Sequence, residues 1–235
     1  MHIIDACTGV TLQQTFEHED DMSEHAWLLL VYRVPTEPTS KRVAVWRDLK
    51  RMGALYLQQC VCILPDLPAV RDDLARVTTK IPEMEGEYTR FEVPCLAADD
   101  AAKIVAAFQT LRDKEYAEII EECETKFVKE IEFEHFRQNY TFEEAEEIGQ
   151  DLEKIRRWYA RIVERDWFGA GRHDEVALWI EKCQELLNAF EQEVYRRSND
   201  DTPGGSPGAV SGVVEIPVIG LTPLKMKHSE KEMGI

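Results

Sequence analysis

Apolar and polar positions follow two different periods along the chain, and the change of period divides it into two parts. Residues 25–97 alternate short apolar runs with short helical repeats, whereas residues 98–197 keep a helical repeat with very few glycines or prolines. Short apolar runs are typical of strands, and apolar residues three or four apart are typical of amphipathic helices. The pattern therefore predicts a small α/β domain at 25–97 and a helical domain at 98–197.

The first part follows the order strand, helix, two strands, helix, strand. The strands are expected at 27–32, 54–57, 61–64 and 87–93, and the helices at 38–52 and 68–83. The first run, WLLLVY, is apolar throughout, which is typical of a central strand covered on both faces. Pro38 suits the first turn of a helix and Gly53 suits its end. The βαββαβ order predicts a ferredoxin-like domain.

The second part predicts three helices joined by short connections. Apolar stripes run over 104–131, 148–162 and 176–194. Thr141 and Glu144 have the spacing of a capping box, and two glycines in DWFGAG separate the second helix from a third over 174–197. Within that break, Trp167 and Phe168 are expected to fill the helix-to-helix corner, with an exposed ligand platform as the alternative. Three such helices predict an antiparallel bundle, so the fold class is α+β.

Composition changes at both ends of the chain. Residues 1–24 are expected to be a disordered extension without the pattern of a secretory signal, and residues 198–235 begin with a linker-like stretch rich in Gly, Pro, Ser and Asp. The last stretch, VVEIPVIGLTPLKMKHSEKEMGI, is apolar but interrupted by proline and glycine. We expect it to be a docked tail or a partner-binding segment. No run reaches the roughly 18 apolar residues that a membrane helix needs.

Net charge narrows the classes of partner. The 235 residues carry a formal charge of −17, which argues against indiscriminate attraction to nucleic acid or anionic membrane. The six cysteines have no framework spacing and suit a reducing compartment, so a cytoplasmic location is expected. Cys60 and Cys62 are expected to be buried and inert, because C-x-C without further ligands is a weak metal signal.

Against this acidic background, cationic residues gather on and beside the first predicted helix. They are Arg33, Lys41, Arg42, Arg47, Lys50 and Arg51. At about 100° per residue, Val45, Trp46, Leu49 and Met52 are expected to face the sheet. Arg47, Lys50 and Arg51 are expected on the opposite side. Cations on one rigid element can bind phosphate groups. The competing interpretation is the solvated face of an amphipathic helix.

The glutamate-rich stretch 115–164 raises the question of a metal pair. Ferritin-like carboxylate sites need Glu-x-x-His pairs pointing inward from two helices, and here His135 stands alone, three residues after Glu132. We expect most of these acids to be solvated. Because no P-loop, paired-glycine fingerprint, zinc quartet or nucleophile elbow is present, neither a cofactor nor enzymatic activity is predicted.

The stretch WLLLVYRVPTEPTSKRVAVWRDLKRMGALYLQQCVCILPD, residues 27–66, resembles the N-terminal domain of the ChrB chromate-resistance regulators. The later segments EYAEIIEECETKFVKEIE and TFEEAEEIGQDLEKIRRWYARIVERDWFGA are similar to the same family's helical part, so the resemblance covers about residues 26–197. The core also resembles the middle domain of PaaX-type repressors and the small ferredoxin-like CRISPR-associated nucleases, which commonly dimerise. The resemblance implies a cytoplasmic, non-enzymatic regulator of a chromate-efflux operon.

Three hypotheses follow. The first is a homodimer, paired through its sheet domain, whose basic helix and Arg33 contact operator DNA phosphates or the chromate oxyanion. The second is an interaction scaffold that docks on a partner without binding DNA. The third and weakest is a metal-dependent nuclease, because such relatives place an aspartate where this chain has Val31-Tyr32-Arg33 and a divalent ion needs hard ligands. ChrB proteins usually carry a second, C-terminal domain, and if sensing or operator binding resides there, we expect this chain to lack that part of the function.

Overall fold

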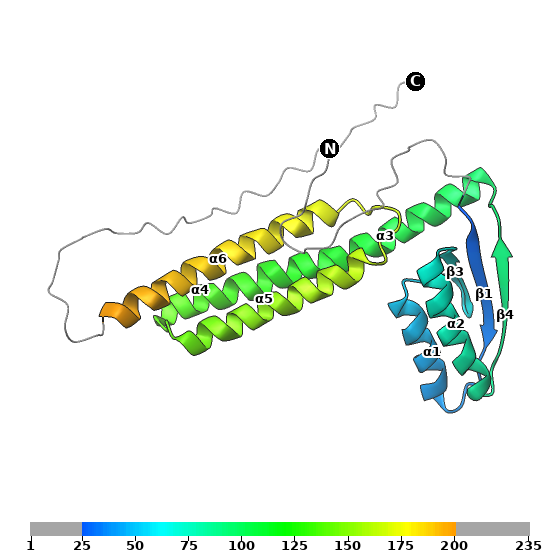
Figure 1. The fold of residues 1–235 in the computed structure, drawn as a ribbon, viewed down its shortest axis with the longest axis horizontal. Helices are drawn as coiled ribbons and strands as arrows, with labels where there is room; N and C mark the ends of the chain where they lie inside the picture. The colour runs from blue at the N-terminus through cyan, green and yellow to red at the C-terminus, as the bar shows by residue number, and fades with distance from the viewer. Residues whose placement is uncertain (1–24, 201–235) are drawn as a thin grey trace, which may run out of the picture.

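A computed structural model describes residues 25–200, so the predicted extension at 1–24 and the tail from 201 onward lie outside the described residues (Figure 1). The class is α+β, with one antiparallel sheet and a set of long helices. The strands are β1 (Trp27–Arg33), β2 (Leu55–Gln58), β3 (Val61–Pro65) and β4 (Glu87–Val93). The helices are α1 (Thr39–Arg51), α2 (Pro68–Glu83), α3 (Ala98–Glu122), α4 (Val128–Arg137), α5 (Phe142–Val163) and α6 (His173–Asp200), with a π-helical turn η1 (Cys123–Phe127) between α3 and α4.

The four strands form one sheet in the order β2-β3-β1-β4. Strand β1 is central and antiparallel to both neighbours, with Leu29 opposite Ile63 on one side and Phe91 on the other. Successive side chains of a strand point to opposite faces. Leu28 and Leu30 therefore share a face, on which α1 and α2 pack to close an apolar core (Figure 1).

The opposite face of β1 is covered only in part. Trp27 is buried there against Phe108 of α3, with the two rings stacked 6.2 Å apart. Val31, on the same face, keeps 38% of its surface exposed. The expectation that the whole strand is covered on both faces is therefore correct at its start and wrong at its end, because the core that α3 forms with the sheet gathers around Trp27 and Ile63.

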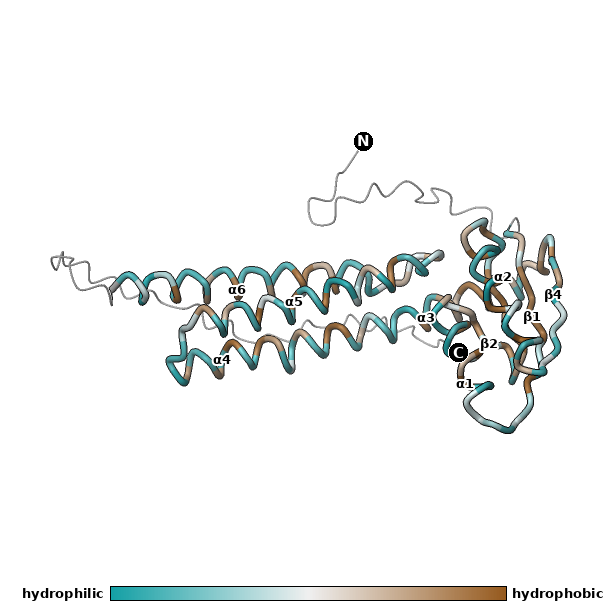
Figure 2. Tube along the Cα trace, turned by 60° about the horizontal axis from the view of Figure 1, so that its bottom comes forward, coloured by the Kyte–Doolittle hydropathy of each residue, from teal (hydrophilic) through white to brown (hydrophobic). Residues whose placement is uncertain are grey.

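The helices after the sheet lie side by side around a second apolar core. Figure 1 shows α3, η1 and α4 as one continuous rod beside α5 and α6, and Figure 2 shows apolar positions recurring along each of them. At the start of α5, the Thr141 hydroxyl accepts a hydrogen bond from the Glu144 backbone N–H at 3.2 Å, which confirms one half of the predicted capping box. The other half is wrong, because the Glu144 carboxylate accepts from the Asn139 side chain at 3.1 Å and forms no bond to the Thr141 backbone N–H among the described residues. Helix α6 ends three residues beyond its predicted end.

The corner between α5 and α6 joins the helices to the sheet. Phe168 stacks on Trp27 at 5.7 Å and contacts Phe108 at 5.3 Å. The same corner reaches Gly53, which follows α1 with a positive φ of 86°, and a Cβ atom at this position would lie 3.1 Å from the Cβ of Arg165. Trp167 and Phe168 were expected to fill the space between two helices. They do so and also pack against the sheet.

No helix within residues 25–200 combines the length and the apolar character needed to cross a bilayer.

Candidate functional site

Helix α1 presents a narrow buried face. Val45 and Leu49 are buried in the core under the sheet. Trp46 was expected beside them, but 44% of its surface is exposed. The expectation is wrong because Trp46 lies about 80° from the middle of the face that Val45 and Leu49 define. Its ring therefore stands at the edge of the packed surface, among the cationic side chains.

This tryptophan lies within a row of cations. Arg42, Trp46 and Lys50 follow one another at intervals of four, so their side chains are neighbours on the helix surface. The Lys50 ammonium lies 5.3 Å from the centre of the Trp46 ring, and Arg47 is exposed beside it. We call Arg42, Trp46, Arg47 and Lys50 the cationic stripe.

Two of the six candidate cations are neutralised. The Lys41 ammonium lies 2.8 Å from the Glu85 carboxylate and lowers the pKa of that carboxyl. The Arg51 guanidinium lies 3.2 Å from the Asp48 carboxylate, and the Lys80 ammonium lies 2.7 Å from the same carboxylate. Within residues 25–200, no ion pair is found for the other four candidates, Arg33, Arg42, Arg47 and Lys50. Three of these four unpaired candidates therefore lie in the cationic stripe.

Arg33 does not belong to that stripe. It is the last residue of β1 and lies opposite Glu87 of β4. By the alternation of the strand it shares the face of Val31, whereas α1 packs on the face of Leu28 and Leu30. The structure thus separates Arg33 from the helix with which the sequence grouped it.

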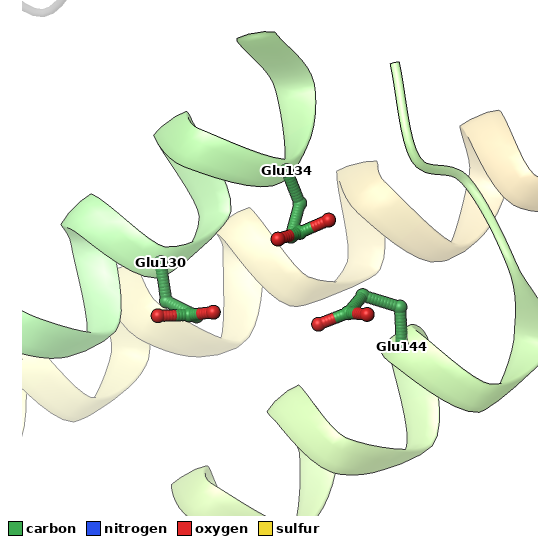
Figure 3. Close-up of side chains that lie close together, drawn as sticks. All are labelled: Glu130, Glu134 and Glu144. Carbon is green, nitrogen blue, oxygen red and sulfur yellow. The ribbon is translucent and has the colours of Figure 1, made fainter. Parts of the chain in front are cut away.

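A second cluster of charge lies at the far end of the helices. Carboxylate oxygens of Glu130, Glu134 and Glu144 lie within 4.8 Å of one another, with two of the residues on α4 and one on α5 (Figure 3). Glu134 is only 2% exposed and is an exception to the expectation that these acids are mostly solvated, which holds for Glu121, Glu124, Glu143, Glu146 and Glu147. A signal was present in the sequence, because Glu134 follows Phe127 and Ile131 at helical spacing on the apolar stripe.

Oxygen ligands of this type suit hard cations such as Ca²⁺ and Mg²⁺, but the buried carboxylate already has partners. Glu134 accepts hydrogen bonds from Asn139 at 2.6 Å and from Arg137 at 3.2 Å. Burial, and then the neighbouring charges of Glu134, Glu147 and Glu130, raise the pKa of Glu144. The cluster is accordingly a hydrogen-bonded connection between α4 and α5, with Asn139 bridging two carboxylates.

The cysteine pair near β3 is divided between a turn and a strand. Cys60 lies in the turn before β3 with a positive φ of 65°, and Cys62 is fully buried in the sheet. Burial raises the pKa of the Cys62 thiol to about 12, so the thiolate that binds metals or reacts is strongly disfavoured there. The predicted buried and inert character of Cys62 agrees with this environment. The expectation that Cys60 is also buried is wrong, because Cys60 stands in the turn and is only partly buried.

Comparison with known proteins gives two matches. A family model described as "Protein ChrB, N-terminal" matches residues 42–201, a range that contains the whole cationic stripe. "Protein ChrB" of Cupriavidus metallidurans is 37% identical over 97 residues, which are 40% of this chain and 29% of that protein. The chain thus matches less than a third of the length of this relative.

Proposed function

Because the chain belongs to the ChrB family, we propose that it is a cytoplasmic, non-enzymatic regulator in a chromate-resistance system that binds the phosphates of operator DNA through α1. The observation that supports this proposal most directly is the cationic stripe, whose cations form no ion pair with the described residues in a protein of net charge −17. Phosphate contacts from a rigid helix position a protein on the duplex.

The shape of this surface favours a DNA backbone over a free oxyanion. Arg47 and Lys50 are exposed and Arg42 is partly exposed, and the three lie at successive positions along one convex helix. A row of separated cations matches a row of phosphates, whereas a small anion such as chromate is best held where several donors converge on one point. We therefore place DNA ahead of the oxyanion as the ligand of α1.

Charge reversal of the stripe tests the proposal. We expect Arg42→Glu with Arg47→Glu to weaken binding to a duplex by roughly tenfold or more and to reduce the slope of log K against log salt by about two. Fluorescence anisotropy of a labelled duplex across a salt series measures both. The matched control is Lys114→Glu with Lys129→Glu, which makes the same change of net charge on exposed sites of α3 and α4.

The outcomes discriminate between the hypotheses. Equal loss in the control pair would mean that net charge, and not the stripe, governs binding. A wild-type protein that does not bind DNA even at low salt would leave the scaffold hypothesis, and magnesium- or manganese-dependent cutting of the duplex would favour the nuclease.

We also infer that the sheet unit is ferredoxin-like and that the long helices form an antiparallel three-helix bundle. The sheet order β2-β3-β1-β4 and the placement of α1 and α2 on one face support the first assignment. The shared core of α3, α5 and α6 supports the second.

The uncovered sheet face supports the proposed homodimer. Val31 and Phe91 lie on that face, 38% and 48% exposed, beside the partly buried Leu29. Exposed apolar groups on a flat surface are typical of an association site. We expect Phe91→Asp to convert a dimer into a monomer in light scattering, with Phe136→Asp on α4 as a control. A monomeric wild-type protein, or a dimer that survives the change, would remove this part of the proposal.

A further inference from the structure

A groove runs between α5 and α6. It has a volume of about 740 Å³, and its floor is made of small and aliphatic residues: Ala145, Gly149, Leu187 and Val194. Phe142 and Tyr195 stand at one end, 53% and 61% exposed, with their rings 5.3 Å apart. Two large aromatic side chains left open beside an apolar floor indicate a surface that binds another apolar segment.

We infer that this groove binds the apolar segment 213–224 of the same chain, VVEIPVIGLTPL. The segment lies outside the described residues, and its sequence supplies the required chemistry, because it is dominated by valine, isoleucine, leucine and proline. Prolines at 217 and 223 disfavour a helix and favour an extended peptide. About seven of its twelve residues, when extended, cover the roughly 22 Å that α5 rises between Phe142 and Arg157 along the groove.

The tether places the segment within reach. Helix α6 ends at Asp200, and residues 201–212 connect it to the segment. A flexible linker of this length has a root-mean-square span of roughly 19 Å. Leu187 faces Gly149 near the middle of the groove and lies about 20 Å back along α6 from Asp200, and the Arg157 end of the groove lies roughly 12 Å further. Twelve residues reach up to about 40 Å when extended, so the linker covers the whole groove. It holds the segment at a high effective concentration, so that weak apolar contacts suffice for occupancy.

Charge along the groove is mixed. Glu146 and Glu191 lie towards its aromatic end, and Glu153, Lys154 and Arg157 lie towards the other end, where Lys154 is paired with Asp151 at 2.6 Å. The apolar floor, and not charge, therefore selects the segment.

Hydrogen–deuterium exchange on the full chain tests this inference. We expect the amides of 213–224 to exchange roughly tenfold more slowly than in a free peptide of the same sequence. Gly149→Leu fills the floor and is expected to abolish this protection. Gly149→Ala is the matched control, because a Cβ at this position meets Leu187 at an ordinary 3.8 Å, and it is expected to keep the protection. Ile216→Asp, which alters no described residue, is expected to abolish it as well.

Each outcome is decisive. Exchange as fast in the wild-type chain as in the free peptide overturns the inference, as does protection that persists in Gly149→Leu. Protection that rises with protein concentration over a hundredfold range would assign the groove to the segment of a second copy, because only intermolecular binding depends on concentration. That result would overturn the intramolecular assignment. DNA binding is measured separately, so the two proposals fail independently.

Discussion

Replacing Phe108 with alanine is expected to lower the free energy of unfolding by about 3–5 kcal/mol, the usual cost of deleting a buried aromatic ring. Phe108 is 2% exposed and lies within 5.3–6.2 Å of three other rings, those of Trp27, Trp167 and Phe168. These rings come from the first strand and from the α5–α6 corner, so the cavity cannot be closed by one local shift. The melting temperature is expected to fall on the order of 10 °C.

The same change is expected to uncouple the two parts of the molecule. Phe108 links α3 to the open face of the sheet and to the α5–α6 corner, so its loss weakens the contact that makes both parts unfold together. Calorimetry is expected to show one transition in the wild-type protein and two in the variant. Phe136→Ala is the control, because that ring is 85% exposed. A fall in melting temperature no larger than in this control would contradict the assigned role of Phe108.

Arg112 is expected to respond in opposite ways to two substitutions. Its guanidinium is 2% exposed, and its Nη1 atom lies 3.0 Å from the Glu115 carboxylate. No acceptor among the described residues forms a hydrogen bond with its Nε or Nη1 atoms. Burial lowers the pKa of this guanidinium, against the opposing charge of Glu115. The arginine therefore carries a desolvation cost that its single ion pair offsets only in part.

Arg112→Ala is expected to lose about 3 kcal/mol or more, because it leaves a cavity and removes the buried partner of a carboxylate. Arg112→Met is expected to lose less than about 1 kcal/mol or to gain stability. Methionine fills most of the volume and removes the N–H groups that lack acceptors, while Glu115 keeps its contact with Arg165 at 2.9 Å.

Urea unfolding at equilibrium measures both variants, with Lys114→Met on the exposed side of α3 as the control. Equal losses in the alanine and methionine variants would show that the charge of Arg112, and not its volume, stabilises the fold.

Patterns of neighbouring residues were sufficient to predict the helices and strands themselves. Helix 68–83 and strand 87–93 were predicted with the bounds that the structure has, because proline at the start of a helix and strict alternation in a strand are signals carried by adjacent residues. Thr141 was identified as an N-cap for the same reason, since its partner is only three residues away.

Errors arose where a residue's environment is supplied by a distant segment. Trp46 belongs to the apolar side of α1 by pattern, yet the packed face is too narrow to cover it. In the sequence Glu134 looks like one of many solvated glutamates. In the structure it is buried in the helical core, where its carboxylate accepts hydrogen bonds from Asn139 and Arg137. Lys41 and Arg51 look like free cations until Glu85 and Asp48 are seen beside them.

The amino-acid sequence by itself determined the α+β class, the order of the elements, the cationic helix and the family resemblance. These depend on residue spacings within one helix, strand or turn, where the backbone dictates geometry. Only the tertiary structure decided which cations remain unpaired, that Arg33 lies on the other face of the sheet, and that four aromatic rings join sheet and helices. Charge pairing and burial depend on groups far apart in the chain, and their proximity exists only once the chain has folded.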